Sequence, residues 1–500
     1  MTAMPAAAVM VLGTTSGAGK SLVATGLCRW YRRQGLSVMP FKAQNMSNNA
    51  RVADGGEIGA AQYYQSLAAG AVPCTAMNPV LLKPEGDCRS QVVVNGQVDD
   101  RLTTTPWRER STRLWPIVEQ ALTSLRSRCE VLVIEGAGSP AEINLADCDF
   151  VNGRTAAAAD ARCLLVADID RGGAFAHLFG THRLVDDQTR SRIDGFVLNR
   201  FRGDPALLTP GPAMLEALTG VPTVACLPMW RDHGLPEEDG VFDRGMADRF
   251  DAGAGTHRIG RQRTRLRIGI VAYPRISNLD EFEPLRHVPG IRLAWLRDPD
   301  AVAAADWLIL PGSKQSSSDL RWLRERGFES AIAGHAAAGK PLLAICGGLQ
   351  MLGAAMFDAH GVDGDAQGLG LLPLTTWFEP RKTVRAARAA FGALDGPWER
   401  LSMLTVDGYE IRHGRTAADR VADTTGAARP VLAPVNDSAV IGWQRGPVLA
   451  IYLHGLFENP AVMEALFGDP GHHLEAAFER LADRIDAHFE RRTLMALIGR

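Results

Sequence analysis

Hydrophobic residues in the first half of the chain are gathered in short runs without polar alternation. Such runs are typical of strands that are buried on both faces of a parallel sheet. Segments of helical length separate them, so the pattern predicts a doubly wound α/β domain. The predicted strands are Val9–Leu12, Val131–Ile134, Leu164–Ala167 and Phe196–Leu198.

A second set of apolar runs begins after a stretch that is polar and rich in turn residues. This stretch, residues 231–265, contains much Gly, Arg and Asp and little strand pattern, as expected of a domain boundary. We predict a first domain over 1–235, a linker over 236–265 and a second α/β domain over 266–460. Its predicted parallel strands are Leu266–Ala272, Trp307–Leu310 and Leu342–Ile345.

The remaining segment, 461–500, carries apolar residues at helical spacing. Such a stripe predicts an amphipathic helix, and we expect it to pack on its own domain. The residues of the stripe are Leu474, Ala477, Phe478, Leu481, Ile485 and Phe489.

The composition of the chain limits the kinds of molecule that it is expected to bind. A chain of 500 residues with 46% hydrophobic and 22% charged residues is expected to form two or three ordinary globular domains. A formal net charge of -2 gives no electrostatic case for nucleic acid or an acidic membrane as partner. Eight cysteines without a CxxC pair indicate neither a disulfide framework nor a zinc site. Without a secretory signal or membrane span, we expect a cytoplasmic protein, and its oligomeric state stays open.

A glycine-rich loop follows the first predicted strand and precedes a helical segment. It reads Gly13-Thr-Thr-Ser-Gly-Ala-Gly-Lys-Ser21, with five residues instead of the usual four between Gly13 and Gly19. The backbone N–H groups of such a loop, including that of Thr14, can face phosphates, and Lys20 adds a cation. Ser21 is placed to bind Mg²⁺. The loop therefore predicts an ATP site.

Carboxylates at strand ends are the expected partners of a nucleotide-bound Mg²⁺. Glu135 ends a predicted strand and is the first candidate, with Asp54 as the second. Weaker candidates are Glu57, Asp168 and Asp170.

The form of the loop resembles that of dethiobiotin synthetase-like P-loop enzymes. Partition and division ATPases carry a second lysine where this chain has Thr15. The resemblance implies phosphorylation of a substrate carboxylate. Asn199, which follows a predicted strand, is a candidate for contacting the adenine edge.

A cysteine lies at a strand-to-helix turn in the second predicted domain. Cys346 is followed by Gly347 and Gly348, which leave room for a tight turn at a helix N-terminus that favours the thiolate. The N–H of Gly347 is a candidate oxyanion donor, and Gly312 in a Pro-Gly loop is another. His454, at the end of a later strand, is the candidate general base.

This order of residues resembles the class I glutamine amidotransferases. The resemblance implies that Cys346 attacks glutamine, releases ammonia and forms a thioester that water hydrolyses. Those enzymes carry an acid two residues after the histidine, where this chain has Leu456, and whether Glu458 assists stays open. The resemblance to the cobyric and cobyrinic acid amidases implies a Cys–His dyad with little or no orientation by a carboxylate.

Longer motifs narrow the resemblance to the cobyric acid synthase family. The match extends over about residues 7–460. It includes Lys42-Ala-Gln-Asn-Met-Ser-Asn-Asn49, Glu57-Ile-Gly-Ala-Ala-Gln62, Met77-Asn-Pro-Val-Leu-Leu-Lys-Pro84, Glu135-Gly-Ala-Gly-Ser-Pro-Ala-Glu-Ile-Asn-Leu145, Asp168-Ile-Asp-Arg-Gly-Gly173, Leu198-Asn-Arg-Phe-Arg-Gly203, Pro311-Gly-Ser-Lys314 and Gly408-Tyr-Glu-Ile411.

The resemblance implies amidation of the b, d, e and g carboxylates of adenosylcobyrinic acid a,c-diamide, with ATP, Mg²⁺ and glutamine. Two alternatives stay open: the sister amidase that acts on the a and c carboxylates, and a nucleotide switch without enzymatic activity. Polar residues near the loop are compatible with a polycarboxylate partner, although they are equally compatible with loop capping. They are Lys42, Gln44, Asn45, Asn48 and Asn49.

Overall fold

The computed structural model describes residues 5–86, 89–230, 233–236, 266–418, 427–471 and 474–500. Its contacts divide the chain into two compact units. The first unit comprises Met1–Ser47, Gly56–Leu235 and His473–Arg500, and the second comprises Asn48–Gly55 and Pro236–His472. Almost all of the predicted linker, 236–265, lies outside the described residues.

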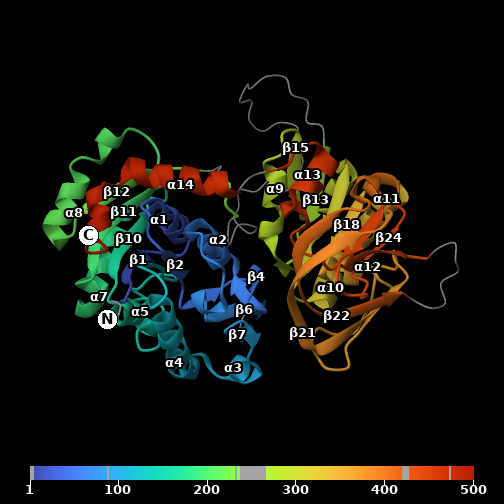
Figure 1. Ribbon diagram of the computed structural model, residues 1–500, viewed down its shortest axis with the longest axis horizontal. Helices are drawn as coiled ribbons and strands as arrows, with labels where there is room; N and C mark the ends of the chain where they lie inside the picture. Colours follow the sequence, from blue (N-terminus) through green and yellow to red (C-terminus); the bar gives the residue numbers. More distant parts are fainter. Residues whose placement is uncertain (1–4, 87–88, 231–232, 237–265, 419–426, 472–473) are drawn as a thin grey trace. The chain divides into compact units, whose positions relative to one another are not determined.

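The first unit is built on a six-stranded parallel sheet, as the apolar runs predict (Figure 1). All four predicted strands belong to it, and two strands that the apolar runs did not reveal form its edges. In spatial order the strands are β12 (Thr223–Pro228), β11 (Ile193–Phe201), β10 (Arg162–Asp168), β1 (Ala7–Gly13), β9 (Val131–Glu135) and β2 (Val38–Phe41).

A smaller sheet and a set of helices complete the first unit. The small sheet contains β3 (Gln44–Met46), β6 (Val80–Gly86), β7 (Arg89–Val94) and β8 (Gln97–Val98), and β5 (Gly56–Gly59) precedes the second helix. The helices are α1 (Lys20–Arg33), α2 (Ala60–Ala69), α3 (Asp100–Thr104), α4 (Trp107–Arg126), α5 (Gly153–Ala159), α6 (Ala174–Leu184), α7 (Asp187–Arg190), α8 (Gly211–Thr219), α14 (Leu474–His488) and α15 (Arg491–Ala496).

The amphipathic segment near the C-terminus is helical, as predicted, but its packing partner was not expected. Helix α14 groups with the first unit and lies along α1, although the second unit precedes it in sequence (Figure 1). Gly26 of α1 allows the close approach, because a Cβ atom there would lie 2.8 Å from Ile485. Arg29 forms ion pairs with Glu475 and Glu479. The apolar stripe therefore completes the core of the nucleotide-loop unit.

The second unit joins a parallel half-sheet to a mainly antiparallel one, in which β19 and β21 are a parallel pair. The parallel half confirms the predicted strands and contains β15 (Ile291–Leu296), β13 (Leu266–Val271), β16 (Trp307–Leu310), β18 (Leu342–Ile345) and β25 (Val448–Ile451). The other half was not predicted. It continues through β24 (Gly442–Arg445), β23 (Arg429–Pro434), β21 (Leu374–Phe391), β19 (Ala355–Phe357) and β20 (Ala366–Gln367), with β22 (Thr405–Ala418) paired to β21.

The remaining elements of the second unit are short. Among them are β4 (Ala50–Ala53), β14 (Ile276–Ser277), β17 (Gly312–Ser313), the 3₁₀ turns η4 (Leu279–Phe282) and η7 (Leu456–Glu458), α9 (Glu283–Arg286), α10 (Ser316–Glu325), α11 (Phe328–Ala337), α12 (Gly347–Leu352) and α13 (Pro460–Phe467).

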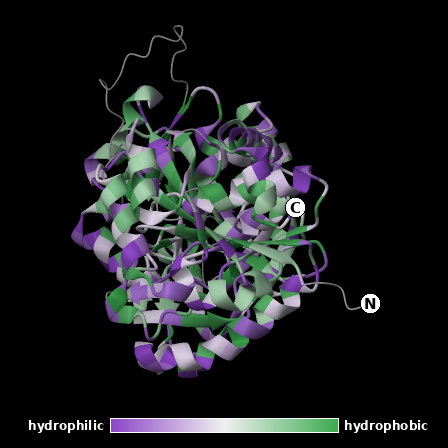
Figure 2. Ribbon diagram, turned by 90° about the vertical axis from the view of Figure 1, so that its left-hand side faces the viewer, coloured by the Kyte–Doolittle hydropathy of each residue, from purple (hydrophilic) through white to green (hydrophobic). Residues whose placement is uncertain are grey.

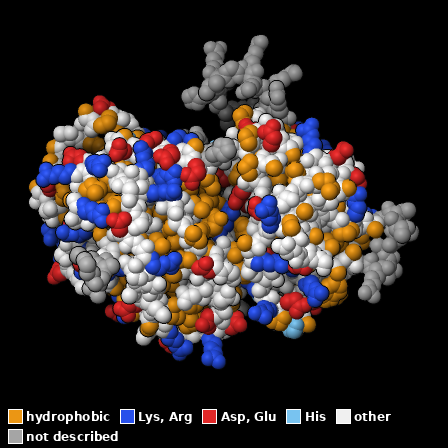
Figure 3. All heavy atoms as spheres, viewed as in Figure 1, with side chains coloured by type: hydrophobic (Ala, Val, Ile, Leu, Met, Phe, Trp, Pro, Cys, Tyr) orange, Lys and Arg blue, Asp and Glu red, His pale blue; other side chains and the backbone are white. Residues whose placement is uncertain are grey.

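Each unit has its own hydrophobic core, gathered on its main sheet. Figure 2 shows apolar residues along the central strands, with hydrophilic residues on the outer helices. On the face drawn in Figure 3, basic and acidic side chains are interspersed, without a broad region of one sign. Among the described residues, no helix combines the length and apolar character needed to span a bilayer.

Candidate active site

The glycine-rich loop connects the central strand β1 to α1, as the sequence predicts. The ammonium group of Lys20 lies over the loop and donates hydrogen bonds to the carbonyls of Thr15 and Gly138, both at 3.0 Å. The hydroxyl of Thr14 is buried without a hydrogen-bond partner within the described part of the chain. A buried cation and an unused hydroxyl beside turned backbone amides fit a phosphate ligand.

Glu135 forms the polar centre beside this loop. The carboxylate accepts hydrogen bonds from the hydroxyl of Ser21 and the ammonium of Lys42, each at 2.8 Å, and from Gln65. Burial alone would raise the pKa of Glu135, but Lys42, with the hydrogen bonds from Gln65 and Ser21, brings it below the usual value. The carboxylate therefore stays ionised next to the loop.

The other candidate metal ligands are exposed or bound in ion pairs of their own. Asp54 is exposed and belongs to a segment that groups with the second unit. Glu57 forms a buried ion pair with Lys83 at 2.6 Å. Asp168 pairs with Arg200 at 2.9 Å. The structure thus brings only Ser21 and Glu135 of the proposed set together.

Asn199 stands at the loop, but its amide is occupied. The side-chain nitrogen donates to the carbonyl of Ala18 at 2.9 Å. A Cβ atom on Gly19 would lie 2.0 Å from that nitrogen, so only glycine allows the packing. Asn199 therefore braces the phosphate loop, and contact with the adenine edge remains a hypothesis.

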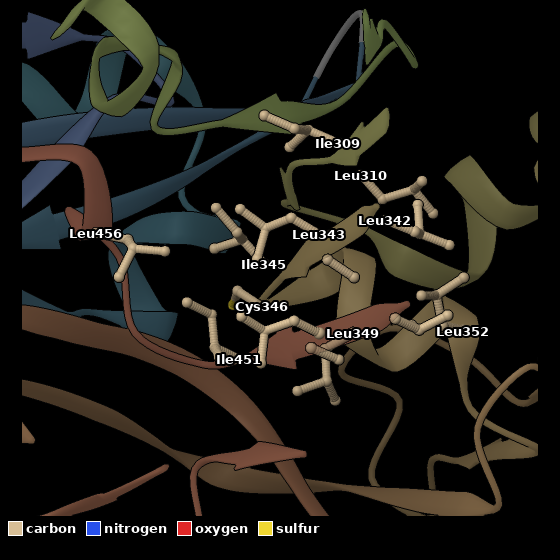
Figure 4. Packing of buried hydrophobic residues seen from close by; sticks show 14 of the residues in the cluster. Ile309, Leu310, Leu342, Leu343, Ile345, Cys346, Leu349, Leu352, Ile451 and Leu456 are labelled. Atoms are coloured by element: carbon tan, nitrogen blue, oxygen red, sulfur yellow. The ribbon is translucent and has the colours of Figure 1, made fainter. Parts of the chain in front are cut away.

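Cys346 occupies the sharp turn between β18 and α12. Its φ angle is 50°, in the left-handed region that non-glycine residues rarely adopt. Such backbones are concentrated at functional sites because the surrounding fold must hold them in place. Figure 4 shows Cys346 among Ile345, Leu349 and Ile451, and its side chain is buried. The thiol thus sits in a desolvated setting at the end of a core strand.

His454 lies beside Cys346, and the structure supplies the carboxylate that the sequence did not reveal. The Cys346 thiol donates to the carbonyl of Ile411 at 3.6 Å, and its interaction with the imidazole raises the pKa of His454. On the other side of the ring, Nδ1 lies 3.0 Å from Glu281 Oε1. The second oxygen of Glu281 accepts the N–H of Gly455 at 3.1 Å. The expected dyad without an orienting carboxylate is therefore wrong: the geometry is a Cys–His–Glu triad.

The environment favours the protonated form of His454. Burial by itself would lower the pKa of the imidazole, but the carboxylate of Glu281 and the interaction with Cys346 raise it to about 10. At neutral pH the ring therefore carries a proton that faces the thiol. Glu458, whose role was open, is turned to Arg51 instead.

The two candidate oxyanion loops also meet at the cysteine. A Cβ atom on Gly347 would lie 2.6 Å from the backbone nitrogen of Ser313. A Cβ atom on Gly312 would lie 3.0 Å from the Cε1 atom of His454. Both glycines are therefore required by close packing beside Cys346 and His454, and their backbone amides as oxyanion donors stay a prediction.

Comparison with known proteins covers the whole chain. Residues 9–239 match the CobQ/CobB/MinD/ParA nucleotide binding domain, and residues 267–462 match the CobB/CobQ-like glutamine amidotransferase domain. Cobyric acid synthase of Variovorax paradoxus is 59% identical over 494 residues, 98% of this chain and 99% of that protein. The synthase of Leptothrix cholodnii is 57% identical over 512 residues, covering 99% and 98%. The chain belongs to the cobyric acid synthase family.

Membership of the cobyric acid synthase family joins the two sites into one kind of enzyme. A nucleotide-binding domain and a glutamine amidotransferase domain in one chain are the parts of an ATP-dependent, glutamine-hydrolysing amidoligase. The positioning residue that sequence reasoning missed is Glu281. It lies 65 residues before the cysteine, in Asn278-Leu-Asp-Glu-Phe282, where Asp280 and Phe282 flank it, and no sequence pattern marks it as the buried acid that faces a histidine.

Proposed function

We propose that this chain amidates the b, d, e and g carboxylates of adenosylcobyrinic acid a,c-diamide to give adenosylcobyric acid. The observation that carries the proposal is near-full-length identity with cobyric acid synthases, combined with a phosphate loop and a Cys–His–Glu triad in the same chain. A cytoplasmic location remains a prediction.

In the nucleotide unit, each amidation begins with a substrate carboxylate, which is a poor electrophile until it is phosphorylated. A substrate carboxylate oxygen attacks the γ-phosphorus of ATP, ADP leaves, and an acyl phosphate forms. Ammonia then attacks the acyl carbon, and inorganic phosphate departs as a stable leaving group. We assign Lys20 to the transferring phosphoryl group, because its ammonium lies within the loop that would hold the phosphates.

The proposed Mg²⁺ site consists of Ser21 and Glu135. A hydroxyl and an ionised carboxylate 2.8 Å apart beside the loop fit the donor set of Mg²⁺, which takes one or two protein oxygens plus phosphate and water. Bound there, Mg²⁺ would neutralise charge on the phosphates. Lys42 offers a second cation on the same carboxylate.

In the amidotransferase unit, the Cys346 thiolate attacks the side-chain amide of glutamine. His454 gives its proton to the departing nitrogen, so ammonia leaves and a glutamyl thioester remains. His454 then takes a proton from water, which attacks the thioester and releases glutamate. We assign Glu281 to holding the ring and stabilising its charge, and backbone amides at Gly312 and Gly347 to the oxyanion.

The test uses the purified chain with ATP, Mg²⁺ and either glutamine or ammonium chloride. Mass spectrometry should show four new amides on adenosylcobyrinic acid a,c-diamide and little reaction on cobyrinic acid. Cys346→Ala should abolish synthesis from glutamine while leaving synthesis from ammonium within about threefold, since only the ammonia source is removed.

Other outcomes would identify the alternatives. Two amides added to cobyrinic acid would indicate the sister amidase. ATP hydrolysis that is indifferent to every corrinoid acid would favour a nucleotide switch. Loss of both nitrogen sources in a folded Cys346→Ala protein would contradict the division of labour.

A further inference from the structure

A short piece of chain from the nucleotide half is built into the amidotransferase unit. Residues 48–55, here called the strap, group with the second unit. The residues on both sides belong to the first unit, where Ser47 donates its N–H to the carbonyl of Leu82 at 3.0 Å. The strap is therefore joined covalently at both ends to the unit that carries the phosphate loop.

The strap is attached directly to the turn that carries Glu281. The side-chain oxygen of Asn49 accepts the N–H of Leu279, the first residue of η4, at 2.9 Å. The carbonyl of Ala50 accepts the side-chain amide of Asn278 at 2.7 Å. Both contacts fix the entry to the 3₁₀ turn on which Glu281 is the third residue.

Arg51 lies at the centre of the strap and contacts residues near two members of the triad, Glu281 and His454. Its Nε donates to Asp280, the neighbour of Glu281, at 2.7 Å, and its terminal nitrogen pairs with Glu458, four residues after His454. The guanidinium also lies 5.1 Å from the centre of the Tyr409 ring.

Tyr409 connects Arg51 to the imidazole ring of His454. Its ring stacks on His454 with 5.3 Å between centroids and 19° between planes, and the two residues exchange backbone hydrogen bonds. The hydroxyl of Tyr409 accepts from Asn278 at 2.7 Å, so the strap and the stacking residue share one anchor.

Buried ion pairs such as those of Arg51 with Asp280 and Glu458 can have a purely structural role. However, ion pairs of this kind contribute little net stability, and their best-attested use is to fix one arrangement. Arg51 is 1% exposed, and it joins the turn of Glu281 to the segment after His454. A displacement of about 1 Å at such groups is enough to lower a rate about 100-fold.

The strap is also connected closely to the residues of the nucleotide site. Lys42, a few residues before the strap, holds the Glu135 carboxylate that also binds Ser21 of the phosphate loop. Residues 44–46 form β3 of the small sheet, and the strap follows at once. A change at the phosphate loop that moves Lys42 thus acts on a segment that is continuous with Arg51.

We propose that the strap couples the two activities: Arg51 is a positioning residue that holds Glu281 and His454 in their productive arrangement, and the state of the nucleotide site sets how well it does so. This inference rests on the proposed glutaminase and amidation reactions. Glutamine hydrolysis then runs fast only when the nucleotide unit is loaded, which prevents wasteful release of ammonia.

The experiment measures glutamate release by the full chain, without and with ATP, Mg²⁺ and the corrinoid acid. The wild type should be stimulated by loading. In Arg51→Met, the kcat for glutamine should fall about 10- to 100-fold with little change in KM, and stimulation should disappear. Arg51→Lys should recover part of the rate. Synthesis from ammonium should be unchanged in both variants.

Two further variants separate positioning from folding. Arg267→Met removes an ion pair with Asp306 in the same unit and should leave both rates unchanged. Asn49→Ala loosens the strap without uncovering a charge and should lower the ratio of glutamate release with loading to release without loading. Asn49→Ala decides the matter if Arg51→Met fails to fold.

The outcomes that overturn the proposal are distinct from failure of the proposed function. Wild-type glutamate release that ignores loading, or a folded Arg51→Met or Asn49→Ala protein with normal kcat and stimulation, refutes the coupling. Absence of amidation with every corrinoid acid and ammonium refutes the proposed function instead.

Discussion

Replacing Glu281 by glutamine removes one charge from the triad and keeps the shape of the side chain. In the wild type, Glu281 Oε1 lies 3.0 Å from His454 Nδ1, and both side chains are buried. Two unit charges at that distance attract by about 5 kcal/mol at an effective dielectric constant of about 20. Since about 1.4 kcal/mol corresponds to one pKa unit, this attraction is large enough to outweigh the effect of burial on the ring.

In Glu281→Gln, the charge that does most to raise the pKa of His454 is removed, so this pKa falls from about 10 towards the lower value that burial favours. The ring then holds its second proton less firmly, and Nδ1 loses its charged acceptor. We expect the glutamine-dependent rate to drop about 10²- to 10⁴-fold, the range seen when a triad loses its orienting acid.

The pH dependence gives the sharper measurement. The raised pKa of His454 stabilises the folded wild type below about pH 6.5, and this contribution is lost as the pH rises through about 10. The alkaline limb of glutamine hydrolysis should lie near that upper value in the wild type and at a clearly lower pH in the variant. The stability difference between the two proteins should shrink over the same interval.

The assay follows glutamate release from pH 5 to pH 10.5, with synthesis from ammonium as an internal reference for the other unit. Glu283→Gln is the matched control, because Glu283 lies two residues away and contacts His287 and Arg286, not the triad. A Glu281→Gln protein whose rate stays within about threefold of the wild type, with an unchanged alkaline limb, would refute the assignment of Glu281.

Two further predictions concern the nucleotide unit. Lys20→Ala should abolish synthesis from glutamine and from ammonium alike, as measured by phosphate release, whereas Lys340→Ala in the second unit should leave both intact; retained turnover without Lys20 would dismiss the phosphate loop. Gly26→Val should lower the free energy of unfolding by about 1–3 kcal/mol in chemical denaturation, because its side chain collides with Ile485 across α1 and α14. Gly180→Val is the control, since a Cβ atom there meets nothing within 4 Å, and equal stability of the two variants would contradict the packing argument.

The sequence predicts those parts of the site that are made by contiguous residues. The phosphate loop and the cysteine turn each combine a buried strand, glycines and a helix, so a few adjacent positions determine the local backbone. Ser21 and Glu135 could be predicted to lie at one site, because parallel strands end at the same edge of a sheet. These are short-range rules, and the structure places both motifs as expected.

What the sequence could not supply depends on contacts between distant segments. Glu281 lies in a run with two other acids, Asp280 and Glu283, and no periodicity tells which of the three faces a histidine far along the chain. The stripe of α14 predicts an apolar helix face but not the element that this face packs against. That element is α1, where Gly26 leaves the space for Ile485. The second half of the sheet was not predicted for a similar reason, since β21 mixes buried, half-buried and exposed positions without a regular alternation.

The return of α14 to α1 has a consequence for how the protein is made. The ribosome delivers the phosphate loop early, but the helix that covers α1 only after every residue of the amidotransferase unit has been synthesised. Until then the apolar side of α1 around Leu27 and Trp30 lacks its cover. The core of the nucleotide unit is thus completed only once α14 has been synthesised.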